Sequence, residues 1–322
     1  MPGASPSAGS RSFISRLRNG DEIARITTFL FAATVVLITV LLVVQLWHDS
    51  SLPRHKFGLS FFATRVWDPI AEEFGALPFI YGTIVTAVTA LLIAVPLGLG
   101  AAIFLAELAQ PKISDTLQFF IDLLAAVPSV IYGLLGVFII IPAMRGYIQP
   151  VLKHTLGFLP LFQGPAYGVG FFTAGIVLAI MVIPYIISVS REVLLSVPRD
   201  QREAALALGS TRWESTWKVV VPFARTGIMG SIFLALARAL GETMAVTMVI
   251  GNTPTISASL LSPGYSIAAV IANELTEATS TIHFQSLVEL GLVLFLLTFI
   301  LNGLARLMMV LTTQKGSGMG HV

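Results

Sequence analysis

The 322-residue sequence contains no cysteine, which excludes disulfide bonds, thiolate metal sites, iron–sulfur clusters and cysteine nucleophiles. Charged residues are also scarce. Asp, Glu, Lys and Arg make up 11% of the chain, against roughly a quarter in soluble domains. Hydrophobic residues make up 55%. So few charged side chains cannot cover a water-facing surface, so we expect lipid to surround most of the protein. The net charge of +2 argues neither for nor against a nucleic-acid partner.

Six apolar stretches are long enough to cross a bilayer at about 20 residues per crossing. The first lies too far from the N-terminus for a signal peptide and lacks a small-residue cleavage site, so we interpret it as a retained span with Trp47 at the interface. The sequence therefore predicts an all-α integral membrane protein with six transmembrane helices. Their approximate limits are 28–47, 80–106, 116–142, 168–190, 226–250 and 287–312.

The Lys and Arg residues are distributed unequally between the two sides of this arrangement. If the N-terminus is inside, most of the 19 fall in inner segments, fewer fall in outer loops, and Arg238 lies inside the fifth span. Cytoplasmic loops carry the excess of Lys and Arg. We therefore expect a multi-pass protein of the cytoplasmic (inner) membrane with both termini in the cytoplasm.

A single six-helix membrane domain is expected over 21–312. The tails, 1–20 and 313–322, are small, polar and rich in Gly and Ser, so we expect both to be disordered. Residues 21–25 are expected to start a helix that follows the inner surface before it turns into the first span. No fixed-period repeat and no separate soluble domain are evident.

Two outer loops are long enough to have structure of their own. The loop 48–79 is expected to pack on the spans or lie at the interface through its aromatic residues. The loop 251–286 contains no Lys or Arg and is expected to form a short surface helix within 266–278. We expect Glu289, which follows this loop, to be solvated. The aromatic residues of the first loop are Phe61, Phe62, Trp67 and Phe74.

Proline and glycine lie within several predicted spans. Each proline removes one backbone donor and bends its helix, and small residues allow helices to approach closely. Together they favour a closely packed bundle whose helices move, although prolines are also simply common in membrane helices. The prolines are Pro96, Pro128 and Pro184, and the glycines are Gly98, Gly100, Gly133, Gly136 and Gly175.

The inner segment 191–225 has an organised centre, REAALALGSTRWESTWKVVVP. Strong helix formers precede Gly209, which can end a helix in the left-handed conformation, and Thr211 can cap the next helix. A DNA-binding helix-turn-helix would need an apolar residue at Ser215 and freedom from the membrane, so we set nucleic-acid binding aside. A solvated amphipathic loop remains the plain alternative.

The Glu203-Ala204-Ala205 triplet, followed by Gly209 and by Pro222, resembles the EAA loop of permease subunits in ATP-binding-cassette importers. The resemblance extends over roughly 65–312 and is greatest to phosphate-importer permeases of the PstC type. The stretches that carry it are WDPIAEEFGALPFIYGT (67–83), LLAAVPSVIYGLLG (123–136), REAALALGSTRWE (202–214), RALGETMAVTMVIGN (238–252) and PGYSIAAVIANELTEA (263–278).

This resemblance implies a type I importer (MetI-like) fold whose EAA loop docks into a cytoplasmic ATPase. It implies as partners a second homologous permease of the PstA type, two ATPase subunits and an extracytoplasmic phosphate-binding protein. The chain has no Gly-rich GKS/GKT loop, so ATP and Mg²⁺ are expected on the ATPase, and we expect no cofactor, metal or catalytic residue here. The residues expected to couple to the ATPase are Glu203, Ala204, Ala205, Gly209, Trp213 and Pro222.

Arg238 and Glu242 interrupt the apolar run LALARALGETMAV. A charge at the centre of a membrane helix costs about 2.5–3.5 kcal/mol on insertion scales. Four residues apart on one helix, the two would share a face and neutralise each other. One interpretation is a purely structural ion pair facing the bundle interior.

The other interpretation is a substrate path for an oxyanion. An arginine fork matches tetrahedral oxyanions, and residues of this kind at this place are linked to anion passage in the resembled family. Glu242 would hold the fork, or would accept a proton that phosphate can donate and sulfate cannot. Thr243 and Thr247 are further candidates for the path.

Asp122 lies in the predicted third span and is interpreted as a structural residue.

The sequence leaves other functions to compare with phosphate import. An importer of the same architecture for sulfate, molybdate or a phosphonate stays open. The EAA loop argues against an ion-coupled secondary transporter. An intramembrane enzyme is set aside because every histidine lies in a loop or tail. These histidines are His48, His55, His154, His283 and His321.

Overall fold

The computed structural model describes residues 21–317, with side chains described over 22–307. The expected disordered tail 1–20 and the end of the expected tail 313–322 lie outside these residues. Six helices in the described part are long and apolar enough to cross a membrane, as predicted. The chain divides into two units, Met1–Asp49 and Ser50–Val322, which we describe separately.

The first unit contains the helix α2 (Asp21–Asp49), which is continuous. The predicted helix start at 21–25 is therefore confirmed, whereas the helix continues into the first span without the break that a turn after residue 25 would require. Three threonine hydroxyls, from Thr28, Thr34 and Thr39, donate to the carbonyl four residues earlier. Such bonds satisfy polar side chains within the helix itself, which suits a segment surrounded by lipid.

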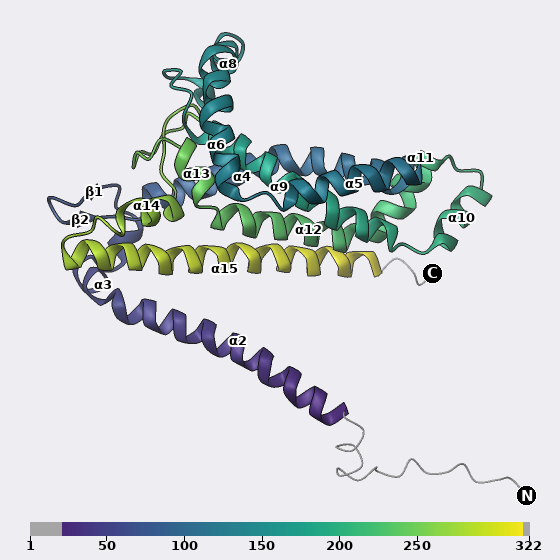
Figure 1. Ribbon diagram of the computed structural model, residues 1–322, viewed down its shortest axis with the longest axis horizontal. Coiled ribbons are helices and arrows are strands. Elements are labelled where there is room, and N and C mark those ends of the chain that lie inside the picture. The colour runs from purple at the N-terminus through teal and green to yellow at the C-terminus, as the bar shows by residue number, and fades with distance from the viewer. Residues whose placement is uncertain (1–20, 318–322) are drawn as a thin grey trace, which may run out of the picture. The chain divides into compact units, whose positions relative to one another are not determined.

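The second unit is a helical bundle with a small two-stranded antiparallel sheet (Figure 1). Several of its long helices contain π-helical turns, which join shorter α-helical pieces into one rod. The elements are α3 (Ser51–Phe57), a 3₁₀ turn (Gly58–Phe62), β1 (Trp67–Asp68), β2 (Glu73–Phe74), α4 (Leu77–Ile103), a π turn (Phe104–Leu108), α5 (Pro111–Ala125), α6 (Ser129–Leu135), a π turn (Gly136–Ile140), α7 (Ile141–Ala143), a π turn (Met144–Ile148), α8 (Gln149–Leu156), a 3₁₀ turn (Pro160–Phe162), α9 (Phe171–Leu195), α10 (Arg199–Ala207), α11 (Arg212–Ser215), a π turn (Thr216–Val220), α12 (Val221–Gly241), α13 (Met244–Val249), α14 (Ile267–Glu274) and α15 (Thr281–Ser317).

The third span differs from the prediction. Its apolar rod runs from Ser129 to Leu156, whereas the sequence favoured 116–142. Residues 111–125 instead form the separate helix α5, and Pro128 is the N-cap of α6 rather than a bend inside a span. The prediction was wrong because α5 has an apolar face, so its residues and those of the following helix read as one continuous apolar stretch. Pro96 and Pro184 do lie inside α4 and α9, as expected.

Asp122 consequently lies in α5 and not in a span. Its carboxylate accepts hydrogen bonds of 2.7 Å from Gln118 and from Ser188 of α9. It therefore joins α5 to α9, which agrees with the structural role we expected. The helix α15 reaches Ser317, so the residues from 313 to 317 are helical and the expected disordered tail does not begin at 313.

Small side chains bring α4, α9 and α12 together in the core. Alanines fill much of this cluster, and glycines mark the closest approaches. A Cβ on Gly175 of α9 would lie 2.5 Å from the Thr89 side chain of α4, and one on Gly98 of α4 would lie 2.7 Å from Ile186 of α9. The predicted close packing is therefore confirmed at Gly98 and Gly175, and the prediction is wrong at Gly100, where no atom lies within 4 Å of an added Cβ.

The loop 50–79 packs on the bundle through its aromatic residues, as expected. Phe61, Phe74 and Phe79 are almost fully buried against α14 and α15. The helix expected within 266–278 is α14, but its first turn is buried instead of lying on the surface. Burial raises the pKa of nearby Tyr265 to about 12, so this phenol stays neutral.

Glu289 of α15 is 4% exposed, so the expectation that it is solvated is wrong. Arg54 Nη1 of α3 lies 3.8 Å from its carboxylate oxygen Oε2. Arg54, in the loop before α4, therefore places a positive charge near the Glu289 carboxylate. The sequence alone did not indicate this partner.

A substitution on α4 tests the close packing. Alanine at Gly82 would place its Cβ 2.1 Å from the backbone oxygen of Tyr265, whereas at Gly100 no atom lies within 4 Å. Overpacking of this kind costs about 1–3 kcal/mol. We expect Gly82→Ala to lower the thermal unfolding temperature of the detergent-solubilised protein and Gly100→Ala to leave it unchanged or raise it. Equal effects of the two substitutions would contradict this packing.

Candidate functional site

The fifth apolar helix is interrupted next to its two charged residues. The helix α12 ends at Gly241, Glu242 has extended backbone angles (φ −71°, ψ 128°), and α13 begins at Met244. The Glu242 carboxylate Oε1 accepts a hydrogen bond of 3.1 Å from the Ala245 backbone N–H. It therefore caps α13, where a helix has unsatisfied donors and favours negative charge.

This break contradicts the predicted geometry of Arg238 and Glu242. The two residues do not share a helix face, and within the described residues no hydrogen bond or ion pair joins them. The i, i+4 rule applies only while the helix continues. The predicted intrahelical ion pair is wrong because the chain leaves the helix between the two positions.

Arg238 instead lies against an aromatic ring of α9. The guanidinium carbon of Arg238 is 4.1 Å from the centroid of the Tyr185 ring, within the range of cation–π attraction. The Arg238 Nε atom is buried and has no hydrogen-bond partner. Among the described residues, none accepts a hydrogen bond from this guanidinium.

An unpaired guanidinium inside the bundle has an evident chemical use. Arginine carries five N–H donors in a planar fork, keeps its charge, and pairs with carboxylate or phosphate oxygens through two parallel bonds. Ionisable residues within membrane spans are rare, face the bundle interior and mark substrate or ion paths. The arrangement at Arg238 therefore suits a transient anionic ligand.

Two threonines of the interrupted segment were also predicted to line the path. The Thr247 hydroxyl donates to the Thr243 carbonyl at 2.7 Å, and the Thr243 hydroxyl lies 3.4 Å from the Gly241 carbonyl. Both hydroxyl protons are thus directed at backbone carbonyls of the broken segment. Each hydroxyl oxygen can still accept a hydrogen bond but has no proton left to donate. The role of Thr243 and Thr247 in a substrate path stays a prediction.

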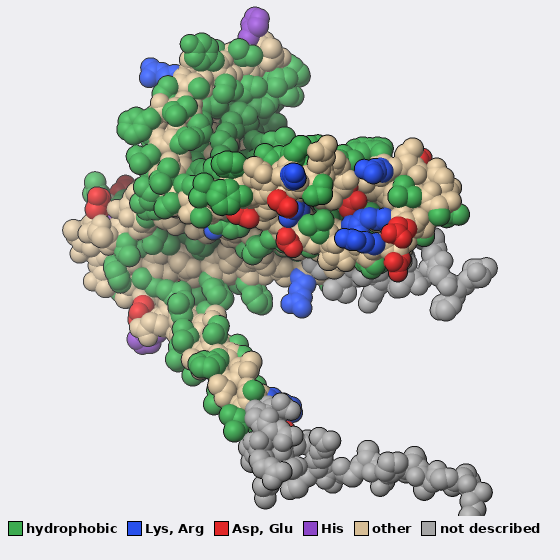
Figure 2. All heavy atoms as spheres, turned by 45° about the vertical axis from the view of Figure 1, so that its right-hand side comes forward, with side chains coloured by type: hydrophobic (Ala, Val, Ile, Leu, Met, Phe, Trp, Pro, Cys, Tyr) green, Lys and Arg blue, Asp and Glu red, His purple; other side chains and the backbone are tan. Residues whose placement is uncertain are grey.

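The inner segment folds as the sequence predicted. The helices α10 and α11 flank Gly209, whose φ is +86°, and Thr211 forms a reciprocal capping box with Glu214. Figure 1 shows this pair of helices at the opposite end of the second unit from α14. In Figure 2, acidic and basic side chains gather toward that end, while the rest of the visible bundle is mostly apolar.

Most of the residues predicted for coupling lie at the surface of this segment. Glu203 and Ala204 of α10 and Pro222 of α12 are exposed, and Ala205 is partly buried. Trp213 and Trp217 are both about half exposed and form an edge-to-face pair with ring centroids 5.6 Å apart. The structure thus brings these residues to one end of the bundle, and their coupling role stays a prediction.

An ion pair that the sequence analysis missed fastens this segment to the bundle. Arg202 Nη2 of α10 lies 2.8 Å from Glu107 Oε1, in the π turn that follows α4, and Arg202 Nε reaches both Glu107 oxygens. Arg202 also donates to the Leu194 carbonyl of α9 at 2.7 Å. The partners are 95 residues apart, so the only sequence signal was a lone acid in the apolar run FLAELA.

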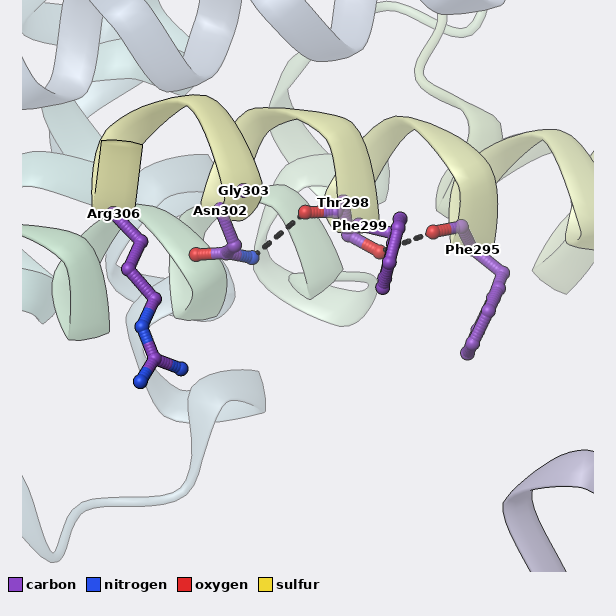
Figure 3. A pocket seen from close by; sticks show the side chains of 6 residues that line it. All are labelled: Phe295, Thr298, Phe299, Asn302, Gly303 and Arg306. Atoms are coloured by element: carbon purple, nitrogen blue, oxygen red, sulfur yellow. Dashed lines mark hydrogen bonds between the residues drawn. The ribbon is translucent and has the colours of Figure 1, made fainter. Parts of the chain in front are cut away.

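A cavity of about 490 Å³ lies along α15, away from these residues (Figure 3). Its polar side chains are bonded within their own helix, because Thr298 donates to the Phe295 carbonyl and Asn302 to the Thr298 carbonyl. Arg306 supplies its only charge. Within the described residues, no group of three or more His, Asp and Glu side chains could hold a metal ion.

Six apolar helices, an unpaired arginine inside the bundle and an organised loop between two spans define a multi-pass membrane transport protein. A family model described as "Binding-protein-dependent transport system inner membrane component" matches residues 94–310, more than half of the chain. The chain belongs to this family of permease subunits.

Curated relatives agree with this assignment. The chain is 51% identical over 262 residues to the "Phosphate transport system permease protein PstC" of Xylella fastidiosa (strain Temecula1), covering 80% of this chain and 81% of the relative. It is 44% identical over 304 residues to the protein of the same name from Mesorhizobium japonicum, covering 92% of each. An archaeal relative, from Methanocaldococcus jannaschii, is 38% identical over 293 residues.

Removing the charge of Glu107 tests how α10 is held. The Arg202 and Glu107 side chains are only 20% and 10% exposed. Breaking a buried pair costs about 3–5 kcal/mol, and we expect about 1–3 kcal/mol here because water reaches part of Arg202. Glu107→Gln should therefore lower the unfolding temperature and increase proteolysis within 199–215.

Asp115→Asn is the matched control for this experiment. Asp115 also pairs with an arginine, Arg191, but its side chain is 76% exposed. Exposed pairs contribute about 0–1 kcal/mol. A larger effect at Asp115 than at Glu107 would contradict the anchoring role of the Arg202 pair.

Proposed function

We propose that this chain is a transmembrane permease subunit of an ATP-driven importer that carries inorganic phosphate across the cytoplasmic membrane. In this proposal the phosphate arrives from an extracytoplasmic binding protein. The observation that carries the proposal is the unpaired Arg238 guanidinium inside the bundle of a binding-protein-dependent permease. The names of the relatives support phosphate as the substrate.

Arg238 supplies the attraction for the anion. Its fork donates two parallel hydrogen bonds to two phosphate oxygens, and its permanent charge offsets the cost of removing phosphate from water. No internal carboxylate has to be displaced first, because Glu242 is bonded to the N-terminus of α13. Binding in this way is strong enough for entry and leaves the ion free to move on.

Glu242 contributes to the choice between phosphate and sulfate. Its Oε1 atom caps α13, which leaves Oε2 as an acceptor. Phosphate carries a proton near neutral pH and donates a hydrogen bond to this oxygen, whereas sulfate has no proton to donate. The carboxylate therefore repels a fully deprotonated oxyanion more than a protonated one.

The segment containing α10 and α11 transmits movement from the ATPase. Gly209 sets the angle between the two helices, and exposed Trp213 provides apolar area for docking. The pair between Arg202 and Glu107 carries displacement of α10 to α4 and α9. ATP and Mg²⁺ are held by two cytoplasmic ATPase subunits, which work on this chain and on a second permease of the PstA type.

Both termini are cytoplasmic in this proposal. The loops 48–79 and 251–286 then face the binding protein, and lipid surrounds the six apolar helices. The chain itself performs no catalysis. An importer of the same architecture for another oxyanion is the second candidate, because an arginine fork also suits sulfate.

Uptake of labelled phosphate tests the role of Arg238. Cells that lack this chain and other phosphate uptake routes would be complemented with wild type, Arg238→Gln, Arg238→Lys or the exposed-arginine control Arg306→Gln, at equal membrane abundance. Losing a charge-assisted fork costs roughly 2–5 kcal/mol. We therefore expect at least a tenfold loss for Arg238→Gln, a smaller loss for Arg238→Lys, and wild-type uptake for Arg306→Gln.

Excess unlabelled sulfate in the same assay separates the two candidate substrates. Indifference to sulfate supports phosphate, and competition supports the broader oxyanion importer. Normal uptake by Arg238→Gln would remove Arg238 from the substrate path.

Substitution of Gly209 tests the coupling segment. Its φ of +86° is unfavourable for residues with a Cβ, although no atom would obstruct a Cβ there. Gly209→Val should abolish transport at normal membrane abundance, whereas Gly209→Asn should retain most of it because Asn tolerates the left-handed region. If the ATPase still co-purifies with Gly209→Val and its hydrolysis remains substrate-stimulated, the segment has no coupling role.

A further inference from the structure

We propose that Tyr185 is a positioning residue for Arg238 and thereby determines how the permease presents its charge to an anion. This inference rests on the proposed function of Arg238. The observation behind it is the stacking of the guanidinium on the Tyr185 ring, 4.1 Å from guanidinium carbon to ring centroid. Tyr185 acts through Arg238 and does not itself bind the transported ion.

The ring restricts the directions from which an anion can approach. The guanidinium carbon of Arg238 lies over the Tyr185 ring, so the ring blocks an anion from reaching the guanidinium on that side. The N–H donors that point away from the ring stay open. The aromatic ring therefore limits where a tetrahedral oxyanion can form its paired bonds with this arginine.

The Tyr185 ring is itself held in place from two sides. Its hydroxyl donates to the Ala125 carbonyl at the end of α5, at 2.9 Å. The next residue, Ile186, is fully buried against α4. It packs so closely on Gly98 that a Cβ there would lie 2.7 Å from the Ile186 side chain. Tyr132 of α6 makes a parallel bond to the Leu124 carbonyl, at 2.7 Å. The platform under Arg238 is thus fixed by α5 and by the packing of α9 on α4.

A ring holds the arginine differently from a carboxylate. A carboxylate would neutralise the charge and occupy the same N–H donors that an anionic substrate needs. The ring attracts the cation through its quadrupole and leaves both the donors and the net charge available. Because Glu242 is bonded to the N-terminus of α13 and a tyrosine ring lies beside Arg238, this partly buried arginine stays oriented while it remains open to substrate.

Graded fluorination of the ring at position 185 tests this directly. Tyr185 would be replaced by Phe and by Phe carrying one, two or three ring fluorines, in the full transporter within cells, with membrane abundance measured for each. Fluorine weakens the negative face of the ring and changes its shape little. Cation–π attraction is worth roughly 0.5–2 kcal/mol, a factor of about 2–30.

We expect Tyr185→Phe to keep most phosphate uptake, because the ring remains although the bond to Ala125 is lost. The maximal uptake rate should then fall stepwise with each fluorine, by about 2- to 30-fold over the series. Tyr185→Leu, which keeps apolar packing without a π face, should resemble the trifluorinated variant. The same fluorinated series at Tyr81, whose hydroxyl also donates to a backbone carbonyl, should show no such gradient, because the Arg238 guanidinium lies over Tyr185.

The outcomes separate this inference from the proposed function. A flat response to fluorination at position 185, with Arg238→Gln inactive, overturns the positioning role and leaves the proposed function standing. Equal losses in Phe and Leu variants assign Tyr185 to the hydroxyl bond with Ala125 and also overturn it. Normal uptake by Arg238→Gln overturns the substrate path and this inference with it.

Discussion

The interruption of the fifth helix between Gly241 and Met244 is the feature on which the site depends. In a bundle surrounded by lipid, a free helix end must find partners for its backbone donors. The Glu242 carboxylate supplies one, through its bond to Ala245. Because the acid is used in this way, the arginine one turn earlier has no counter-ion among the residues that the structure describes, and its charge remains available.

The remaining packing keeps that charge oriented without neutralising it. Tyr185 stacks on Arg238, and the Tyr185 hydroxyl is bonded to the end of α5. The same α5 is joined to α9 through Asp122, so the platform belongs to the rigid part of the bundle. Close packing of α4 on α9 at glycines then sets the distance between these elements. The proposed anion path needs no binding site built from many side chains, because one oriented arginine fork supplies the donors.

The end of the molecule that carries α10 and α11 uses a different kind of contact. Two short helices around Gly209 expose polar and aromatic side chains, and their connection to the bundle runs through Arg202. Since Arg202 bonds both to Glu107 and to the Leu194 carbonyl, movement of α10 reaches α4 and α9 together. These are the two helices that meet at the glycine contacts, and α9 carries Tyr185. If this segment docks on an ATPase as proposed, the Arg202 contacts and the helix α9 connect it to the Tyr185 ring beside Arg238.

The all-α membrane architecture, the number of apolar helices and the two-helix form of the inner segment were predictable from local sequence patterns. These features depend on hydropathy and on turn chemistry within a few consecutive residues, such as the left-handed Gly209 and the Thr211 cap. The limits of the third span, the separation of Arg238 from Glu242 and the Arg202 anchor depend on how the bundle packs, and they became evident only in the folded structure. The helix break after Gly241 lies in an apolar run and changes its composition very little, so hydropathy does not reveal it. The Arg202–Glu107 pair joins residues 95 positions apart, so no sequence periodicity indicates it. The packing of the whole bundle determines which group pairs with a buried charge. An unpaired charge is costly in free energy only where packing has removed it from water.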